Sequence, residues 1–246
     1  MTAPLLQLKG VHTHIGAYHI LHGVDFDVPA GEVTMLLGRN GAGKTTTLRT
    51  VMGLWRASAG DIRFRGRSIA GLETPAIASL GIAYVPERMG IFGDLTVRDN
   101  IVLAARRARH AGELDGARMD WIFGLFPALK TFWMHPAGKL SGGQKQMLAV
   151  ARAICEPRAL ILIDEPTAGM SVDEVPVVLD LIRALKAQRD RTILLVEHKM
   201  DVVRELADRI IVLHDGKLVA DGEPAAVIAS PVVQQAYLGV GREEVL

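Results

Sequence analysis

Cysteine is almost absent from this sequence, which holds Cys155 alone among its 246 residues. A single thiol excludes an internal disulfide bond and favours a protein that works in a reducing compartment. The chain also lacks an excess of charge of either sign, because 28 basic residues stand against 27 acidic ones. This balance argues against bulk binding to nucleic acid or to a membrane surface, although a local basic patch is compatible with it.

Long apolar runs are missing too. No stretch approaches the ~20 apolar residues of a membrane-spanning helix, and the first ten residues, MTAPLLQLKG, lack the pattern of a signal peptide. Apolar residues nevertheless make up 49% of the chain, enough at this length for a substantial core in one large domain or two small ones. We therefore expect a chain that is soluble by itself and reaches a membrane only through a partner.

Strand-like and helix-like segments alternate along the chain. Alternating or short apolar runs predict strands that include residues 5–11, 23–28, 32–38, 81–86, 159–164 and 192–196. Helical periodicity fills the middle of the chain, where helices are expected at residues 96–108, 117–129 and 142–154. This order is typical of an α/β sheet with a helical block inserted into it.

The segment GRNGAGKT, residues 38–45, fits the phosphate-loop pattern G-x-x-x-x-G-K-[ST] between an expected strand and an expected helix. Its glycines let backbone N–H groups turn toward a phosphate, and the helix start adds a positive dipole end. Lys44 then reaches the β- and γ-phosphates, Thr45 offers a hydroxyl to Mg²⁺, and Thr46 bonds the α-phosphate. The alternative, a glycine-rich turn with a surface lysine, is disfavoured by the complete match. The predicted nucleotide-binding residues here are Gly38, Arg39, Asn40, Gly41, Ala42, Gly43, Lys44, Thr45 and Thr46.

The apolar segment LILIDEP, residues 160–166, predicts a strand that delivers two carboxylates at its carboxyl end, where α/β sheets place their ligands. We expect Asp164 to hold Mg²⁺ through water, and Glu165 to orient and deprotonate an attacking water. The alternative is that Asp-Glu-Pro only ends a strand, but a phosphate loop in the same chain makes this interpretation weaker.

A second glycine-rich helix start follows at LSGGQ, residues 140–144. With the phosphate loop and the Asp-Glu strand end, it resembles the nucleotide-binding subunit of an ABC transporter over nearly the whole chain. The resemblance implies one domain, residues 1–246, with an α/β P-loop NTPase (RecA-like) core. An antiparallel β-subdomain and this core would occupy about 1–86 and 155–246, and an inserted α-helical subdomain about 87–154.

The same resemblance implies a head-to-tail pair of homologous ATPase subunits. Each chain would present LSGGQ to the γ-phosphate that the other chain's loop holds, which suits a helix N-terminus with a free hydroxyl. Taken alone, the segment is equally an ordinary serine N-cap followed by glycines. The residues implied to serve the partner's ATP are Ser141, Gly142, Gly143 and Gln144.

Further positions carry over one at a time. His198, after TILLVE, matches the switch histidine that contacts the γ-phosphate, so the implied catalytic residues are Lys44, Glu165 and His198. Asp173 matches the loop that crosses to the partner subunit, and Gly169 and Ser171 would shape this loop.

Two positions depart from the family pattern. Glu87 stands where the family usually has a glutamine that senses Mg²⁺ and the transporter; a carboxylate still binds Mg²⁺ or water but lacks the amide donor. Ile15 stands where an aromatic residue usually stacks on adenine, so it offers an apolar contact without a ring. Either His14 or Tyr18 would substitute, and the sequence does not choose between them.

The segments VPERMGIFGDLTVRDNI, EPTAGMS, LSGGQKQMLA and YLG resemble more narrowly the smaller of the two ATPase subunits of branched-chain amino-acid importers. Importers of urea and short amides are the related alternative. The resemblance implies membrane permease subunits, an external substrate-binding protein, no nucleic-acid partner, and a cytoplasmic position on the inner face of the membrane. Met89, Ile91 and Phe92 would line the groove for a permease helix, or else belong to the core of the helical block.

Three other functions compete with this one. A non-transport ABC ATPase of DNA repair or translation would usually carry two cassettes or a long coiled coil, and neither is present. A P-loop kinase or GTPase would lack LSGGQ. A non-catalytic regulatory subunit would be defective at Lys44, Glu165 or His198, and all three residues are intact.

Overall fold

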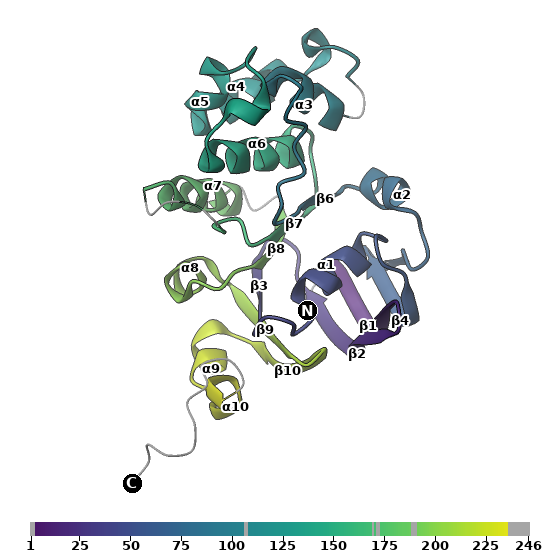
Figure 1. Cartoon of the computed structure of the whole chain (residues 1–246). Coiled ribbons are helices and arrows are strands. Elements are labelled where there is room, and N and C mark those ends of the chain that lie inside the picture. The colour runs from purple at the N-terminus through teal and green to yellow at the C-terminus, as the bar shows by residue number, and fades with distance from the viewer. Residues whose placement is uncertain (1–2, 106–107, 169, 171–172, 188–190, 236–246) are drawn as a thin grey trace.

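The computed structural model describes residues 3–105, 108–168, 170, 173–187 and 191–235. Two sheets organise this part of the chain (Figure 1). The larger has six strands in the order β10-β9-β3-β8-β7-β6, of which only β10 runs antiparallel to its neighbour. Its strands are β3 (Val33–Leu37), β6 (Ile82–Val85), β7 (Leu160–Asp164), β8 (Thr192–Val196), β9 (Arg209–His214) and β10 (Lys217–Gly222).

The smaller sheet is antiparallel, with the strand order β2-β1-β4-β5. A tight turn at Arg65 and Gly66, both with positive φ (53° and 75°), joins its last two strands. This is the backbone conformation that two-residue hairpin turns require. The strands are β1 (Leu6–Ile15), β2 (Tyr18–Val28), β4 (Ala57–Phe64) and β5 (Arg67–Ser68).

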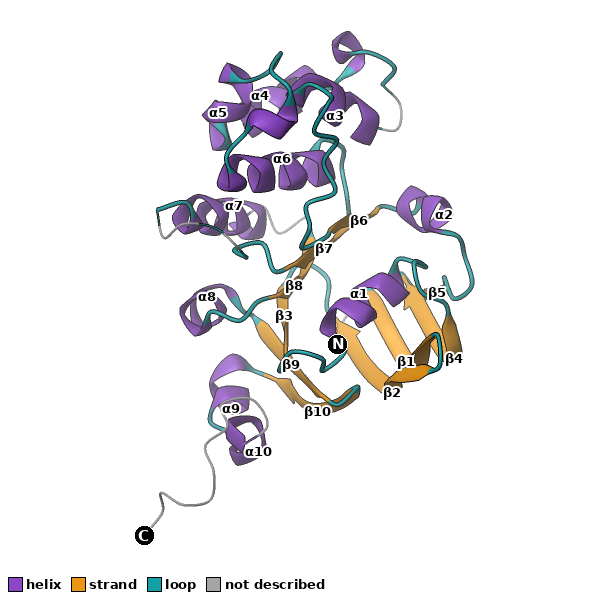
Figure 2. Ribbon diagram, in the orientation of Figure 1, coloured by secondary structure: helices purple, strands orange, loops and turns teal. Residues whose placement is uncertain are grey.

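Strand alternation separates the interior into two cores. Ile161 and Ile163 of β7 pack with the helices on one face of the six-stranded sheet, whereas Leu160 and Leu162 pack with the smaller sheet and α1 on the other. Every residue of β3, β7 and β8 is buried, as expected for a parallel sheet that is covered on both faces. Figure 2 shows the six-stranded sheet nearly edge-on between these two layers.

The helical block occupies one end of the molecule (Figure 1). The helix expected at residues 142–154 is present with those bounds, but the one expected at 117–129 is two helices that meet at Phe126. Pro127 begins the second helix, and a proline has no N–H with which to continue the first. The α-helices of the chain are α1 (Lys44–Val51), α2 (Thr74–Ser79), α3 (Val97–Ala104), α4 (Gly116–Leu125), α5 (Pro127–Thr131), α6 (Gly142–Ile154), α7 (Val175–Ala187), α8 (Met200–Leu206), α9 (Pro224–Ile228) and α10 (Pro231–Val233).

Candidate functional site

The loop between β3 and α1 requires glycine at two positions at least. Gly43, which caps the start of α1, has φ of 100°, and a Cβ atom there would lie 2.8 Å from Leu21 Cδ2. A Cβ at Gly38 would lie 2.3 Å from the Leu213 carbonyl oxygen, closer than real contacts allow. The backbone of residues 38–43 therefore curls in a path that side chains would block, and the start of α1 faces into it.

Lys44 is folded back over this loop. Its Nζ donates hydrogen bonds to the carbonyl oxygens of Gly38 and Arg39, at 2.9 and 3.1 Å, and the residue is only 5% exposed. Burial lowers the pKa of Lys44, and attraction to the carboxylates of Glu165 and Asp164 only partly opposes that effect. The ammonium group is thus held where a further anion would stabilise it. Around it, Ala42 is buried, Thr46 is half-buried, and Arg39, Asn40 and Gly41 are exposed.

Asp164 ends β7 and is fully buried. One carboxylate oxygen accepts a hydrogen bond from Thr45 Oγ1 at 3.1 Å, and the other accepts one from the Tyr84 phenol at 3.1 Å. Burial raises the pKa of Asp164, the two hydrogen bonds oppose this rise, and the carboxylates of Glu165 and Glu87 add to it. Acidic groups therefore outnumber the one buried cation, Lys44, at this point of the described structure.

Glu165 and His198 meet because β7 and β8 are neighbouring parallel strands that end at the same edge. His198 Nε2 lies 2.6 Å from Glu165 Oε1. Glu165 has a left-handed backbone with φ of 48°, and its N–H donates to the Val196 carbonyl oxygen at 3.0 Å. Such strain in a residue other than glycine persists only where the surroundings hold it, and it clusters at functional sites.

Two supporting residues were not singled out from the sequence. Glu197 is 2% exposed, and one of its oxygens accepts the backbone N–H groups of His198 and Lys199 at 2.7 and 3.2 Å. Its other oxygen accepts the hydroxyl of Thr167. The sequence signal for Glu197 was a charged residue directly after the apolar run TILLV. A carboxylate buried at such a place needs hydrogen-bond donors around it. Glu197 thereby ties the turn that carries His198 to the segment that follows Glu165.

The LSGGQ segment builds a separate helix start. Ser141 caps α6, with Gln144 N donating to Ser141 Oγ at 3.2 Å and Ser141 N donating to Gln144 Oε1 at 3.0 Å. Ser141 Oγ also donates to Glu174 Oε1 at 3.1 Å, and a Cβ at Gly143 would lie 2.2 Å from that same oxygen. Ser141 and Gly142 are exposed. In Figure 1 the strands β6–β8 lie between α6 and α1, so the two glycine-rich helix starts belong to different parts of the surface.

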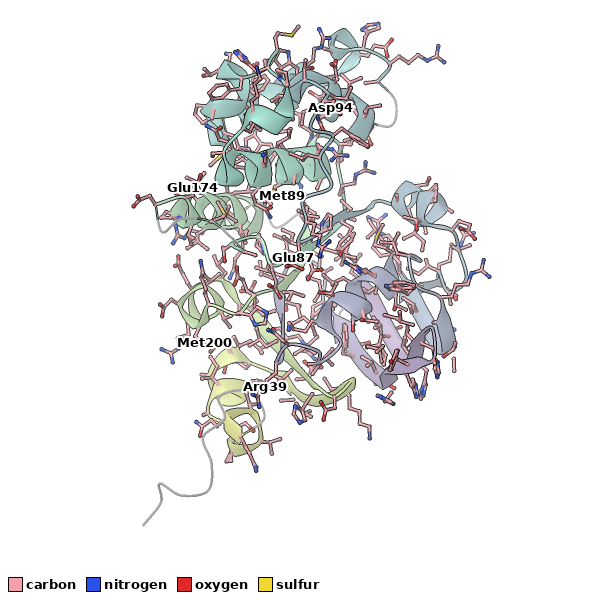
Figure 3. All side chains as sticks on the ribbon, viewed as in Figure 1. Arg39, Glu87, Met89, Asp94, Glu174 and Met200 are labelled. Atoms are coloured by element: carbon pink, nitrogen blue, oxygen red, sulfur yellow. The ribbon has the colours of Figure 1, made fainter. Side chains whose placement is uncertain are left out.

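Glu87 and Met89 follow β6 on the segment that leads toward the helical block (Figure 3). Glu87 is exposed. Met89 lines a cavity of about 720 Å³ between that block and the sheet, together with Tyr84, Arg49 and Arg152. Ile91 is half-buried against the core and Phe92 is 51% exposed beneath the Arg152 guanidinium, 5.4 Å from the ring centroid, so of the three predicted groove residues Met89 lines this cavity.

The β1–β2 hairpin places His14 and Tyr18 on opposite faces. Ile15 pairs directly with Tyr18, which puts both side chains on one face, and Tyr18 is 75% exposed. His14 pairs with His19 on the other face, where the two rings stack with centroids 4.1 Å apart and His14 Nδ1 lies 3.0 Å from Ser58 Oγ. Only Tyr18 therefore shares a face with Ile15.

Some predicted features lie outside the described residues, namely Gly169, Ser171 and the YLG segment; Asp173 is exposed just before α7. Within the described part of the chain, no three or more histidine, cysteine or acidic residues are arranged to hold a metal ion by themselves. No described helix has the length and apolar character needed to cross a membrane.

Comparison with known proteins gives a consistent set of matches. The family model described as ABC transporter matches residues 21–168, a region that contains the phosphate loop, LSGGQ and Asp164–Glu165. The chain is 36% identical to the high-affinity branched-chain amino acid transport ATP-binding protein BraG of Pseudomonas aeruginosa, over 96% of this chain and 100% of that protein. It is 33% identical to the probable branched-chain amino acid transport ATP-binding protein LivF of Archaeoglobus fulgidus, over 90% of this chain and 93% of that one.

A solved structure is similar as well. It is a dimeric ATP-binding cassette in a post-hydrolysis state, bound to ADP and Pi. The TM-score is 0.78 at 25% identity, with 89% of this chain and 98% of that chain covered. The likeness therefore extends from the sequence motifs to the arrangement of both sheets and the helices.

Proposed function

This chain belongs to the ABC transporter family, as an ATP-binding subunit with the P-loop NTPase fold, and from that premise we propose that it hydrolyses ATP to drive the import of branched-chain amino acids. The substrate assignment is supported by the transport proteins named for branched-chain amino acids that match over nine-tenths or more of this chain. An importer of urea or short amides is the alternative. The single observation that carries the ATPase function is the meeting of Lys44, Asp164, Glu165 and His198 around one loop.

Hydrolysis would proceed by attack of water on the γ-phosphorus of ATP. As the new P–O bond forms, the bond to the bridging oxygen breaks and its electron pair leaves with ADP, so the products are ADP and inorganic phosphate. Glu165 accepts the proton of the attacking water. His198, whose Nε2 lies 2.6 Å from Glu165 Oε1, would contact the γ-phosphate. Lys44 and the backbone of residues 38–46 bind the phosphates.

The donor set at the end of β7 fits Mg²⁺. Thr45 and Asp164 offer a hydroxyl and a carboxylate, the oxygen ligands that Mg²⁺ takes alongside nucleotide phosphates and water. The raised pKa of Asp164 indicates a carboxylate whose negative charge lacks a full counter-charge. When bound, Mg²⁺ would neutralise charge on the phosphates. Glu87 follows the carboxyl end of the neighbouring parallel strand β6, so it would face the ion from the same edge of the sheet.

The working unit would be a head-to-tail dimer with a homologous ATPase subunit. Ser141, Gly142, Gly143 and Gln144 form a helix start that lies apart from the phosphate loop of their own chain, which supports a role toward the nucleotide of the partner. The dimeric state of the similar solved cassette supports pairing of two such subunits. We also propose that the chain is divided into a core with its β-subdomain, about 1–86 and 155–246, and a helical subdomain, about 87–154.

The remaining partners would be permease subunits in the membrane. A permease helix would dock at the cavity that Met89 lines, which holds the chain on the inner face of the membrane, and an external binding protein would deliver the substrate. For the nucleotide base, Ile15 supplies an apolar contact and Tyr18, on the same face of the hairpin, supplies the ring.

The test is transport by the native assembly. The chain, tagged and purified from its source membranes with the subunits that accompany it, is reconstituted into proteoliposomes with ATP inside. We expect ATP-dependent uptake of labelled leucine, isoleucine or valine, and none when the tagged chain is Glu165→Gln. Uptake of urea or acetamide without any branched-chain amino acid would replace the proposed substrate by the alternative, and no uptake of either class would refute both.

A further inference from the structure

Tyr84 separates the cavity beneath the helical block from the buried Asp164. The residue lies on β6, the edge strand of the six-stranded sheet, and its backbone pairs with Leu162 of β7. One part of the side chain lines the cavity of about 720 Å³. Its phenol oxygen reaches across to Asp164 Oδ2, 3.1 Å away, two residues further along the neighbouring strand.

The two oxygens of Asp164 are held by donors of different kinds. Thr45 bonds one oxygen, but its hydroxyl is itself assigned to the metal. Tyr84 bonds the other oxygen and is not among the proposed metal ligands. A ligand carboxylate that is fixed by such a neighbour keeps the orientation that metal binding needs.

We propose that Tyr84 is a positioning residue, whose hydroxyl fixes the Asp164 carboxylate for a divalent cation from the side of the cavity. This inference rests on the proposed ATPase function. It also links the cavity to the nucleotide site, because Tyr84 both lines the cavity and donates a hydrogen bond to Asp164.

The variant Tyr84→Phe tests this with a minimal change, since it keeps the ring and removes only the phenol oxygen. The matched control is Thr192→Val, which removes another buried hydroxyl, the one that accepts the Gly31 N–H at 2.9 Å on β8. The affinity for ATP is measured by calorimetry twice for each protein, in EDTA and with saturating Mn²⁺. Thermal unfolding of each protein reports whether it is folded.

Mn²⁺ should tighten ATP binding in both proteins, but the factor by which it does so should be about tenfold smaller in Tyr84→Phe than in wild type. Losses of this size are typical when a hydrogen-bond partner of a metal ligand is removed. Affinity in EDTA should change by less than twofold, and Thr192→Val should keep the wild-type factor. An unchanged factor in Tyr84→Phe, or an equal loss with and without Mn²⁺, would overturn the positioning role. Wild type that binds no ATP at all would instead refute the proposed function, so the two failures are distinguishable.

Discussion

Replacing Asp164 by asparagine should abolish hydrolysis and yet make the nucleotide-free protein more stable. The carboxylate is fully buried, and burial raises its pKa because the charged form is poorly compensated. Asparagine has nearly the same shape, and Thr45 and Tyr84 can both keep a hydrogen bond to its amide. Removing a functional charge of this kind stabilises proteins by about 1 kcal/mol, which for a chain of this size raises Tm by roughly 2–4 °C.

The gain in thermal stability of Asp164→Asn over wild type should depend on pH in a defined direction. Because the folded-state pKa of Asp164 lies above its unfolded value of about 3.9, wild type has its full stability below that value and loses part of it as the pH rises through the raised pKa. Asp164→Asn has no such loss. The difference in Tm should therefore be near zero around the ordinary carboxyl pKa, grow through the interval up to the raised pKa, and stay constant above it.

The assay is thermal unfolding in EDTA without nucleotide, across this pH range. Asp61→Asn is the matched control of opposite sign, because hydrogen bonds from Ser68 and Arg63 lower the pKa of this half-buried carboxyl, so that its charge stabilises the fold above about pH 4. It should lower Tm at pH 7. If Asp164→Asn instead unfolds at or below the wild-type Tm at pH 7, then Lys44 already compensates the charge and the electrostatic argument for a cation site is wrong.

Three further predictions concern hydrolysis and nucleotide binding. Glu165→Gln should bind MgATP normally but turn it over at least ~10²-fold more slowly in a steady-state phosphate-release assay, as loss of a positioned base implies, and near-normal turnover would remove Glu165 from that role. Glu87→Gln should keep ATPase activity within a few-fold at saturating Mg²⁺, because Glu87 is exposed and the amide retains an oxygen ligand; a nearly inactive variant would give Glu87 a catalytic duty. Tyr18→Ala should weaken binding of a fluorescent ATP analogue by about 5- to 150-fold, corresponding to the roughly 1–3 kcal/mol of a stacked base, whereas His14→Ala should not; the reverse order would place the base on the other face of the hairpin.

The sequence was most informative where a local pattern determines the geometry. The residues 142–154 have a serine cap, a glutamine three residues on and apolar periodicity, and α6 has the predicted bounds with both capping hydrogen bonds. The apolar run LILID likewise predicts a strand that delivers Asp164 and Glu165 at its carboxyl end, and β7 ends at Asp164. Neither inference needed any knowledge of side-chain packing.

Other contacts depend on register and packing, which the sequence does not display. Tyr84 reaches Asp164 only because β6 pairs with β7 in one particular register, and a shift by one residue would turn the phenol to the other face. Glu174 contacts Ser141 across 33 positions of sequence, between the start of α6 and the residue just before α7. That Tyr18 shares a face with Ile15, and His14 does not, likewise became visible only with the cross-strand pairs of the hairpin.

The central claim is that LSGGQ serves the ATP of a partner chain, and a mixture of two inactive variants tests it most directly. Lys44→Ala damages the phosphate loop, and Ser141→Arg blocks the exposed start of α6. Labelled ATP retained on a filter is measured for each variant alone, for the mixture, and for wild type. In a heteromeric assembly the two changes are placed on the two different ATPase subunits at equivalent positions.

In a mixed pair, one site joins the two damaged halves and the other joins two intact halves. If Ser141 acts on the partner's nucleotide, the mixture should retain ATP at about one site per mixed dimer, while each variant alone retains none. If Ser141 acts within its own chain, every site in the mixture stays damaged. A mixture that retains no more ATP than either variant alone, under conditions where wild type retains it, would contradict the head-to-tail arrangement.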